Sequence, residues 1–428
     1  MNIKRYFLDN GLEVFLQEDK AVPVAVVNIL YKAGSKNDPR GKKGIAHLFE
    51  HLMFCNKNTS YDYEMQQIGA INNAYTNYDI TNYYCSVPAE HLDRALWLEA
   101  DRMRDLNITQ ESLTIQQNVV IEELKQSYHN SPYGDVIIHL MEMLFVEGHP
   151  YHAPIIGYKE DILSVTIEDI QFFKRRYYTP SNAILVVSGC IDISSTQESI
   201  KRYFENIEYH CDEMSCDCHS CAKAFFCKNS RLVSHGSEGE AIKTLTRAVP
   251  AEAICCGFIT PSRIDKEFYA TAILSEILSC GDSSLLYKNL VEKDKIFSSI
   301  DLEYLDCLFS GVFVINAFLM SGVTVEQAQQ KLTNTINKIN EEVDNREIQK
   351  AKNNILFSLA RQAADIQDRN DLVVNLLHVR DNIDHFEERI KNTTNDEIIK
   401  LIDEIFKKHP WKVMFLKSQK KQNSSLGD

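Results

Sequence analysis

The chain has 428 residues, of which 44% are apolar and 25% are charged, a composition typical of an ordinary soluble globular protein. Its length suggests about two to four domains. The formal net charge of −14 argues against binding to nucleic acid or to anionic membranes. No apolar run approaches the ~18 residues that a membrane-spanning helix needs, so we expect no membrane span.

The N-terminus predicts no export. The first nine residues include two basic side chains but no apolar segment like that of a secretory signal peptide. The chain has 12 cysteines, which are too dilute for a disulfide scaffold. Without an export signal they are expected to be reduced thiols, and a cytoplasmic location is favoured.

Residues 5 to 36 are predicted to form strands. Residues 12–17 alternate between apolar and polar side chains, and residues 24–31 form a second apolar run. Asp9, Asn10 and Gly11 precede the first of these runs and are typical of a hairpin turn. A loop rich in glycine and charge, residues 34–44, leads into the next element.

Residues 44–54 predict a buried helix that carries two histidines and a glutamate. His47, Glu50 and His51 stand at positions i, i+3 and i+4, which share one face of a helix. The other positions are apolar nearly all round, so the helix is expected to be buried. Buried polar groups need partners, and a zinc ion bound by His47 and His51 would supply one. A chance match to this short pattern is the alternative.

His-x-x-Glu-His is the inverted form of the metalloprotease zinc helix. Two neutral imidazoles one turn apart can hold zinc, and Glu50 remains as a nearby carboxylate that is not a ligand. It would accept a proton from the attacking water and later deliver it to the leaving amine. Catalytic zinc has three protein ligands and one open position, so a third ligand must come from elsewhere.

A second helix offers two candidates for that ligand. Residues 119–126 are helical in composition, and a capping-box pattern starts at Thr114. Glu122 and Glu123 both lie in this helix and point about 100° apart. Only one of them can face the metal, and the spacing alone leaves both open.

Several segments of the first half resemble the insulinase/pitrilysin family of zinc peptidases, and most closely the branch of the mitochondrial processing peptidase and its bacterial relatives. The resemblance implies that short or unfolded peptides are hydrolysed in a closed chamber, with one zinc ion per chain. It also implies a dimer with a homologous chain, either identical or different. The similar segments are residues 9–12, 31–35, 44–54, 69–76 and 79–84.

The same resemblance assigns roles to further residues. It carries the third zinc ligand over to Glu123, with Glu122 as the alternative. The earlier, supporting glutamate of the family falls on Gln116, whose amide can bond a ligand but brings no negative charge. Asn73 and Ala74 fall on an edge strand that would pair with the substrate backbone. Ordinary turn and strand packing is the alternative for Asn73.

The first half is predicted to end with a helix at residues 167–178 and an apolar strand at residues 183–189. His149 and His152 precede these elements and are of a metal-ligand type. The family does not use this segment for zinc, so we interpret it as a loop that packs against the core.

A cysteine-rich linker, residues 209–236, is predicted between the two halves. Only Cys218 and Cys221 have the spacing of a metal-ligand pair, whereas zinc ribbons usually have two such pairs. A second small metal site is the alternative. The cluster consists of His210, Cys211, Cys216, Cys218, His219, Cys221 and Cys227.

The second half resembles a copy of the first half without the metal helix. Residues 396–406 and 411–416 repeat the closing helix and strand, and residues 265–278 form a helix without histidine at the equivalent place. We therefore predict an α+β fold with two homologous domains, 1–208 and 237–428, each an antiparallel sheet covered by helices.

The second half departs from the family at two positions. Active members have an Arg and a Tyr that reach the substrate carbonyl, and these positions hold Val291 and Ser298, which cannot stabilise an oxyanion in the same way. Arg263 and Tyr304 lie nearby but out of register. A partner chain could supply both groups, or a homodimer could act with zinc and Glu50 alone. A third interpretation is that the chain retains zinc but is weakly active or serves only as an interaction subunit.

Overall fold

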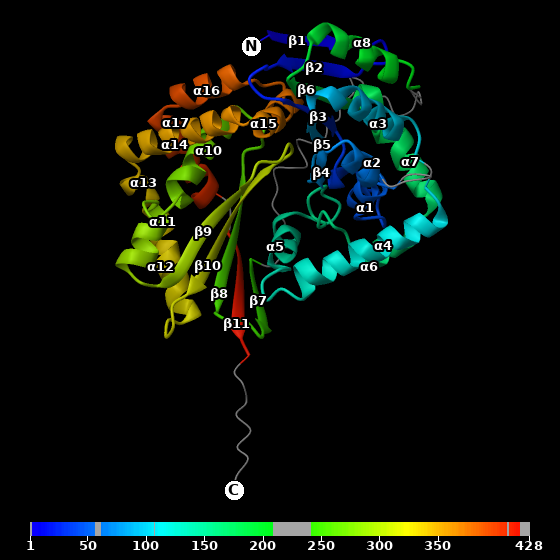
Figure 1. The fold of residues 1–428 in the computed structure, drawn as a ribbon. Coiled ribbons are helices and arrows are strands. Elements are labelled where there is room, and N and C mark those ends of the chain that lie inside the picture. Colours follow the sequence, from blue (N-terminus) through cyan, green and yellow to red (C-terminus); the bar gives the residue numbers. More distant parts are fainter. Residues whose placement is uncertain (1, 56–60, 107, 209–240, 409–410, 420–428) are drawn as a thin grey trace. The chain divides into compact units, whose positions relative to one another are not determined.

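The computed structural model describes residues 2–55, 61–106, 108–208, 241–408 and 411–419 (Figure 1). The predicted cysteine-rich cluster at residues 210–227 lies outside the described residues. The structure has an α+β fold with two sheets, and helices cover both of them. No described helix is both long enough and apolar enough to cross a membrane.

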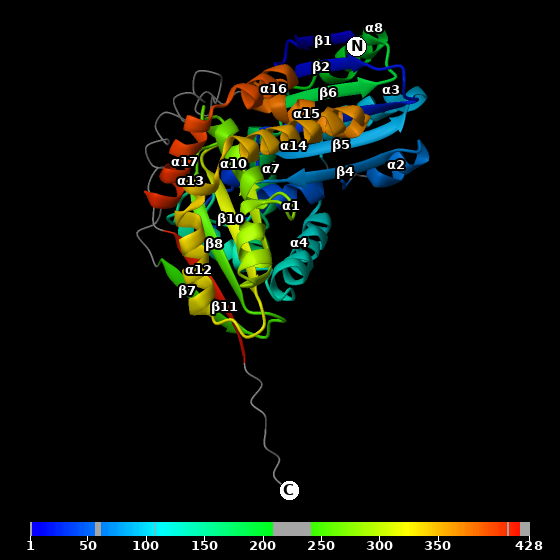
Figure 2. The same ribbon diagram turned by 90° about the vertical axis from the view of Figure 1, so that its left-hand side faces the viewer.

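The first sheet has six strands in the order β1-β2-β6-β3-β5-β4, which can be followed in Figure 2. All neighbouring strands are antiparallel except β2 and β6, which run parallel. The sheet is therefore mixed rather than purely antiparallel, because β6 enters between β2 and β3 after a long helical excursion. The strands are β1 (Asn2–Phe7), β2 (Glu13–Glu18), β3 (Val24–Tyr31), β4 (Ile71–Thr76), β5 (Thr81–Pro88) and β6 (Ala183–Gly189).

The second sheet repeats this topology with five strands in the order β7-β11-β8-β10-β9. Its β7 and β11 are parallel and its other pairs are antiparallel, so it matches the part β2-β6-β3-β5-β4 of the first sheet strand by strand. The predicted duplication is confirmed at the level of topology. The strands are β7 (Ile242–Arg247), β8 (Ala253–Thr260), β9 (Phe297–Leu305), β10 (Gly311–Leu319) and β11 (Lys412–Ser418).

The α-helices of the first half mostly surround the first sheet. They are α1 (Ile45–Leu52), α2 (Tyr61–Gln67), α3 (Leu92–Arg104), α4 (Gln110–Leu124), α5 (Val136–Leu144), α6 (Lys159–Ser164), α7 (Ile167–Tyr177) and α8 (Ile193–Phe204). A π-helical turn, η3 (Lys125–His129), follows α4, and short 3-10 turns are η1 (Ser35–Asn37), η2 (Ala89–His91) and η4 (Pro180–Asn182).

The start of α4 differs from the predicted start at Thr114. The backbone N–H of Ser112 donates to Thr109 Oγ1 at 3.1 Å, and the N–H of Thr109 donates to Ser112 Oγ at 2.9 Å. These reciprocal bonds occupy backbone donors where the helix begins, one turn before the predicted cap. The hydroxyl of Thr114 instead donates to the carbonyl of Gln110 inside the helix, at 2.8 Å.

The helices of the second half are α10 (Phe268–Ser279), α11 (Leu285–Tyr287), α12 (Val325–Asn337), α13 (Ile339–Glu342), α14 (Asn345–Ala364), α15 (Ile366–His378), α16 (Ile383–Asn392) and α17 (Asn395–Lys407), with a π-helical segment η5 (Lys288–Lys293). Helix α10 follows β8 as α1 follows β3, and it has no histidine. It packs against β9 and α17.

The chain forms two compact units that exchange segments between the two halves of the sequence. Residues Lys125–His152, which include α5, belong to the second unit, where α5 packs on β8 and β11. Residues Ser358–Phe386, which include α15, belong to the first unit, where α15 packs on β6 and β3. The division into 1–208 and 237–428 stays a prediction about the sequence halves.

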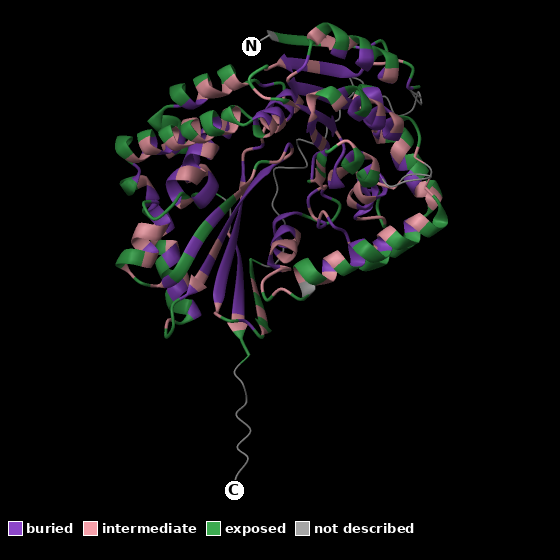
Figure 3. Cartoon of the chain, in the orientation of Figure 1, coloured by how far each residue is buried: buried purple, intermediate pink, exposed green. Residues whose placement is uncertain are grey.

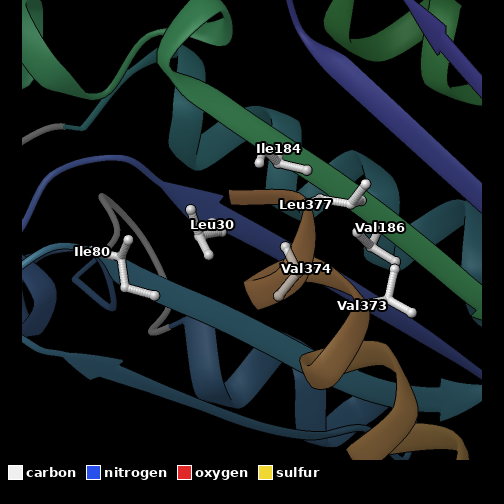
Figure 4. Packing of buried hydrophobic residues seen from close by; sticks show 7 residues of the cluster. All are labelled: Leu30, Ile80, Ile184, Val186, Val373, Val374 and Leu377. Carbon is white, nitrogen blue, oxygen red and sulfur yellow. The ribbon is translucent and has the colours of Figure 1, made fainter. Parts of the chain in front are cut away.

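The packing of α15 closes one face of the first sheet. Val373, Val374 and Leu377 of the helix meet residues of β3 and β6 and one residue before β5 in a buried cluster, shown in Figure 4. The central strands are buried along most of their length (Figure 3). The sheet residues of the cluster are Leu30, Ile80, Ile184 and Val186.

Candidate metal centre

Two backbone contacts fix the start of α1. Gly44 has a φ of 95°, and a Cβ atom there would lie 2.4 Å from the carbonyl oxygen of Ile156. Gly157 has a φ of 81°, and a Cβ atom there would lie 2.1 Å from the carbonyl oxygen of Lys43. Only glycine permits this left-handed conformation and this close approach. The segment around residue 156 therefore anchors the helix that carries the histidines.

The side chain of Asp38 caps this helix from outside it. Asp38 Oδ2 accepts from the N–H of Gly44 at 2.7 Å, and Oδ1 accepts from the N–H of Ala46 at 3.1 Å. These bonds satisfy donors that the first turn of a helix leaves unpaired. Burial raises the pKa of the Asp38 carboxyl to about 7. No local sequence pattern predicts this cap, because eight positions separate Asp38 from Ala46.

The two histidines of α1 and Glu123 of α4 bring three ligand atoms together. Glu123 Oε2 lies 3.5 Å from His51 Nε2 and 3.8 Å from His47 Nε2. One ligand atom from each residue lies within 4.8 Å of the other two. Tetrahedral zinc with bonds of roughly 2.0–2.1 Å separates its ligand atoms by about 3.3 Å. The set fits one zinc ion with little movement, and it is the only such group among the described residues.

The surroundings of the three ligand side chains shift their pKa values. Burial lowers the pKa of His47 to about 4, so its imidazole is neutral at pH 7, as a metal ligand must be. Burial also disfavours the charged form of His51, but hydrogen bonding to Glu123 and the charge of Glu50 raise its pKa above the usual value. The bond to His51 lowers the pKa of Glu123. A metal ion would replace the proton of this pair.

Glu50 lies beside the ligand cluster and outside it. The hydroxyl of Thr76, at the end of β4, donates to Glu50 Oε2 at 2.5 Å. Burial raises the pKa of the Glu50 carboxyl. The carboxylate is thus oriented by one hydrogen bond and binds a proton more strongly than an exposed glutamate does.

Gln116 and Glu122 have different surroundings on α4. Gln116 lies next to His51 and contributes to the raised pKa of that imidazole, and its Nε2 contacts Cys55 Sγ at 3.5 Å. Glu122 is exposed and is not part of the ligand cluster. Sequence reasoning missed Thr76, Asp38 and Cys55. Only Thr76 had a signal, because it ends one of the family-like segments.

Asn73 and Ala74 lie on β4, the last strand of the first sheet. They pair with Tyr84 and Tyr83 of β5, and within the described residues the sheet order places no strand on the other side of β4. The N–H of Ala74 donates to the side chain of Asn73 at 2.9 Å. Helix α1 packs against β4. This sheet edge and the ligand helix are therefore neighbours within one compact unit.

The second unit contains Val291 and Ser298, the two positions that differ from the family pattern. Val291 is half-buried in η5, and Ser298 is exposed on β9 with its hydroxyl donating to the carbonyl of Phe318 at 3.2 Å. Arg263 lies over the ring of Phe268 at 3.8 Å. Tyr304 is largely buried between Phe268 and Phe313, and burial raises its pKa. Both nearby candidates therefore take part in packing.

His149 and His152 likewise have packing roles. His149 Nδ1 accepts from the N–H of Tyr151 at 3.0 Å, and its ring stacks on Phe145 with 4.2 Å between centroids. Burial lowers the pKa of His149 to about 4. His152 Nδ1 lies 2.8 Å from the carbonyl oxygen of Phe145. This agrees with the interpretation of a packed loop.

The third ligand can be tested by metal content. We expect Glu123→Gln to weaken zinc binding by more than the roughly 10–100-fold that the loss of an outer-shell partner costs, because it removes a ligand oxygen with its charge. The matched variant Glu122→Gln makes the same chemical change at an exposed position and should keep the metal. Zinc titration against a chelator would measure both. Loss of zinc in the second variant alone would contradict the assignment.

Zinc binding should also depend on pH through His51. Because the pKa of His51 is raised above its usual 6.5, zinc must displace a proton from it at any pH below that raised pKa. Below that pKa the affinity should fall by about tenfold per pH unit. Competition titrations between pH 5.5 and 8 would measure the slope, and calorimetry in buffers of different ionisation enthalpy would count the released protons. An affinity independent of pH would exclude a protonated His51.

Comparison with known proteins shows which family the chain resembles. The family model described as "Insulinase (Peptidase family M16)" matches residues 13–157, and that described as "Peptidase M16 inactive domain" matches residues 164–355. The chain is 28% identical over 419 residues to "Zinc protease PqqE" of Helicobacter pylori, covering 96% of this chain and 91% of the relative.

Two further similarities extend the comparison. The crystal structure of a protease from Helicobacter pylori superposes with a TM-score of 0.86 at 27% identity, covering 97% of this chain and 99% of that one. A probable mitochondrial-processing peptidase subunit beta of Arabidopsis thaliana is 24% identical over 204 residues, which are 47% of this chain and 38% of the relative. Two matching models of one family, together with these relatives, show that the chain belongs to the insulinase family of peptidases, M16.

Proposed function

We propose that this protein is a zinc-dependent endopeptidase that hydrolyses short or unfolded peptides. The observation that carries the proposal is the placement of Glu50, a partly buried carboxylate held by Thr76 next to three converging ligand atoms and outside their set. The family membership and the zinc proteases among the relatives support the reaction class.

Within this proposal, His47, His51 and Glu123 hold the metal, one ion per chain. Bound zinc would polarise the scissile carbonyl and make water more acidic at the site. Glu50 accepts the proton of the attacking water, and the raised pKa of its carboxyl favours this transfer. The same carboxyl then delivers the proton to the leaving amine. The hydroxyl of Thr76 keeps one carboxylate oxygen fixed during these transfers.

The edge of β4 provides the proposed binding surface for the substrate backbone. An extended peptide can add a strand to a sheet edge, which requires unfolded substrate. Asn73 and Ala74 lie on this edge, and the N–H of Ala74 bonds the side chain of its own neighbour. We infer that Asn73 releases this N–H when a peptide binds. The enclosed chamber that the family resemblance implies would exclude folded proteins.

The proposal includes a homologous partner chain, because Val291 and Ser298 stand where active relatives have Arg and Tyr. The subunit name of the mitochondrial-processing relative describes one component of a larger assembly, which supports a heterodimer. A homodimer acting with zinc and Glu50 alone is the second form of the same function. A zinc-retaining interaction subunit with little or no turnover is the alternative function.

The role of Glu50 is tested by Glu50→Gln. The amide keeps the size of the side chain but accepts no proton, so kcat should fall by about 10²–10⁴ while zinc content stays at one ion per chain. Cleavage of a quenched peptide pool and metal analysis of the same preparation would measure both. Full activity of a zinc-loaded variant would eliminate Glu50 as the base.

The need for a partner is tested by comparing the purified chain with a mixture. A homologous chain that lacks His-x-x-Glu-His but has the Arg and Tyr should raise kcat by about 10²–10³, the usual contribution of an oxyanion donor. The control is the same partner with its Arg changed to Ala. Equal activity of the chain alone would favour the homodimer, and silence of both samples would favour the interaction subunit.

A further inference from the structure

Asp371 of α15 joins three polar side chains on the face of the first sheet that this helix covers. Its Oδ1 accepts from the hydroxyl of Tyr75 at 3.1 Å and from Asn82 Nδ2 at 3.0 Å. Its Oδ2 accepts from Asn375 Nδ2 at 3.2 Å, and the same nitrogen donates to the oxygen of Tyr75 at 3.1 Å. One carboxylate on the helix thus holds a residue of β4 and a residue of β5.

Tyr75 and Thr76 connect this network to Glu50. Successive side chains of a strand point to opposite faces, and the two residues end β4. The ring of Tyr75 packs against the buried cluster formed with α15, whereas the hydroxyl of Thr76 bonds Glu50 of α1. The end of one edge strand is therefore held from both faces, by α15 on one side and by α1 on the other.

An edge strand needs such anchoring more than a central strand does. Among the strands of the described residues, β4 has a single neighbour, β5, which leaves about half of its backbone groups without a ladder partner there. Strand ends with few buried contacts open more readily than the core. A displacement of about 1 Å at a catalytic group can cost a factor of about 10² in rate, and the bond between Thr76 and Glu50 depends on where β4 ends.

We propose that Asp371 is a positioning residue that fixes the end of β4 through Tyr75 and Asn82, and thereby sets both the Thr76–Glu50 bond and the edge carrying Asn73. It belongs to residues Ser358–Phe386, the segment that the second half of the chain contributes to the first unit. The anchoring stands on the contacts alone, and its effect on cleavage rests on the proposed function.

Hydrogen–deuterium exchange of the full-length, zinc-loaded chain tests the anchoring without any activity. In Asp371→Ala and in Tyr75→Phe, the amides of residues 71–76 that bond β5 should exchange at least about tenfold faster, because a charge-assisted hydrogen bond is lost. The control is Asp368→Ala, which removes an exposed carboxylate from the same helix. Wild-type exchange of β4 in the first two variants would overturn the proposal.

Peptide-cleavage kinetics test whether the anchoring by Asp371 affects catalysis. Asp371→Ala should raise KM and lower kcat several-fold at unchanged zinc content, and Asp371→Asn should recover most of both, because its amide oxygen still accepts from Tyr75 and Asn82. Adding Tyr75→Phe to Asp371→Ala should cost little more, since both changes remove the same bond between Tyr75 and Asp371. A fall in kcat that only follows the folded fraction, with KM unchanged, would overturn the positioning role.

The anchoring of β4 and the proposed peptidase function can be refuted independently. If the wild-type chain cleaves no peptide, alone or with a partner, the proposed function fails, and exchange at β4 still decides the anchoring. If Asp371→Ala does not fold, Tyr75→Phe tests the same bond by removing a single hydroxyl and leaving the ring in the buried cluster. Faster exchange in that variant alone would support the anchoring, and unchanged exchange would refute it.

Discussion

The structure of the first unit depends on the partial burial of three polar side chains on α1, His47, Glu50 and His51. The helix packs Ile45, Leu48, Phe49 and Leu52 into the core and presents its imidazoles and Glu50 on another side. Groups of this kind are costly to bury without partners. Glu123 of α4 faces both imidazoles, and the hydroxyl of Thr76 of β4 bonds Glu50. Asp38, the residue after η1, caps the backbone of the helix. The fold therefore has to bring three elements to one short helix.

Local sequence patterns predicted most of the helices and strands, but not which elements pack against one another. The sequence pattern predicted the strands near residues 24–31 and 183–189, the helix at 167–178 and the histidine helix. Their apolar periodicity is formed by residues that are close together in the sequence. The parallel pairing of β2 with β6 was not predicted. The alternation of apolar and polar residues in a strand indicates which face is buried, but not which strands lie next to it. The choice between Glu122 and Glu123 required the rotation of α4 relative to α1, which spacing within one helix does not contain.

The exchange of α5 and α15 has the same physical origin. An amphipathic helix has an apolar face that must be covered, and this face is compatible with either of two sheets of equal topology. Because the sheets repeat one strand order, a helix from one half of the chain can cover the sheet of the other half. The exchange gives the unit with the histidines a polar residue, Asp371, that no motif of the first half could have revealed.

The roles of the two carboxylates follow from their surroundings more than from the motif. Partial burial raises the pKa of Glu50, whereas hydrogen bonding to His51 lowers the pKa of Glu123. Environments that push the pKa values of two neighbouring acids apart separate the group that carries a proton from the group that stays ionised. The same division applies to the imidazoles, since burial keeps His47 neutral while the Glu123 carboxylate favours the charged form of His51. The site thus has one base that can hold a proton and one anion that can hold a cation, before any metal is considered.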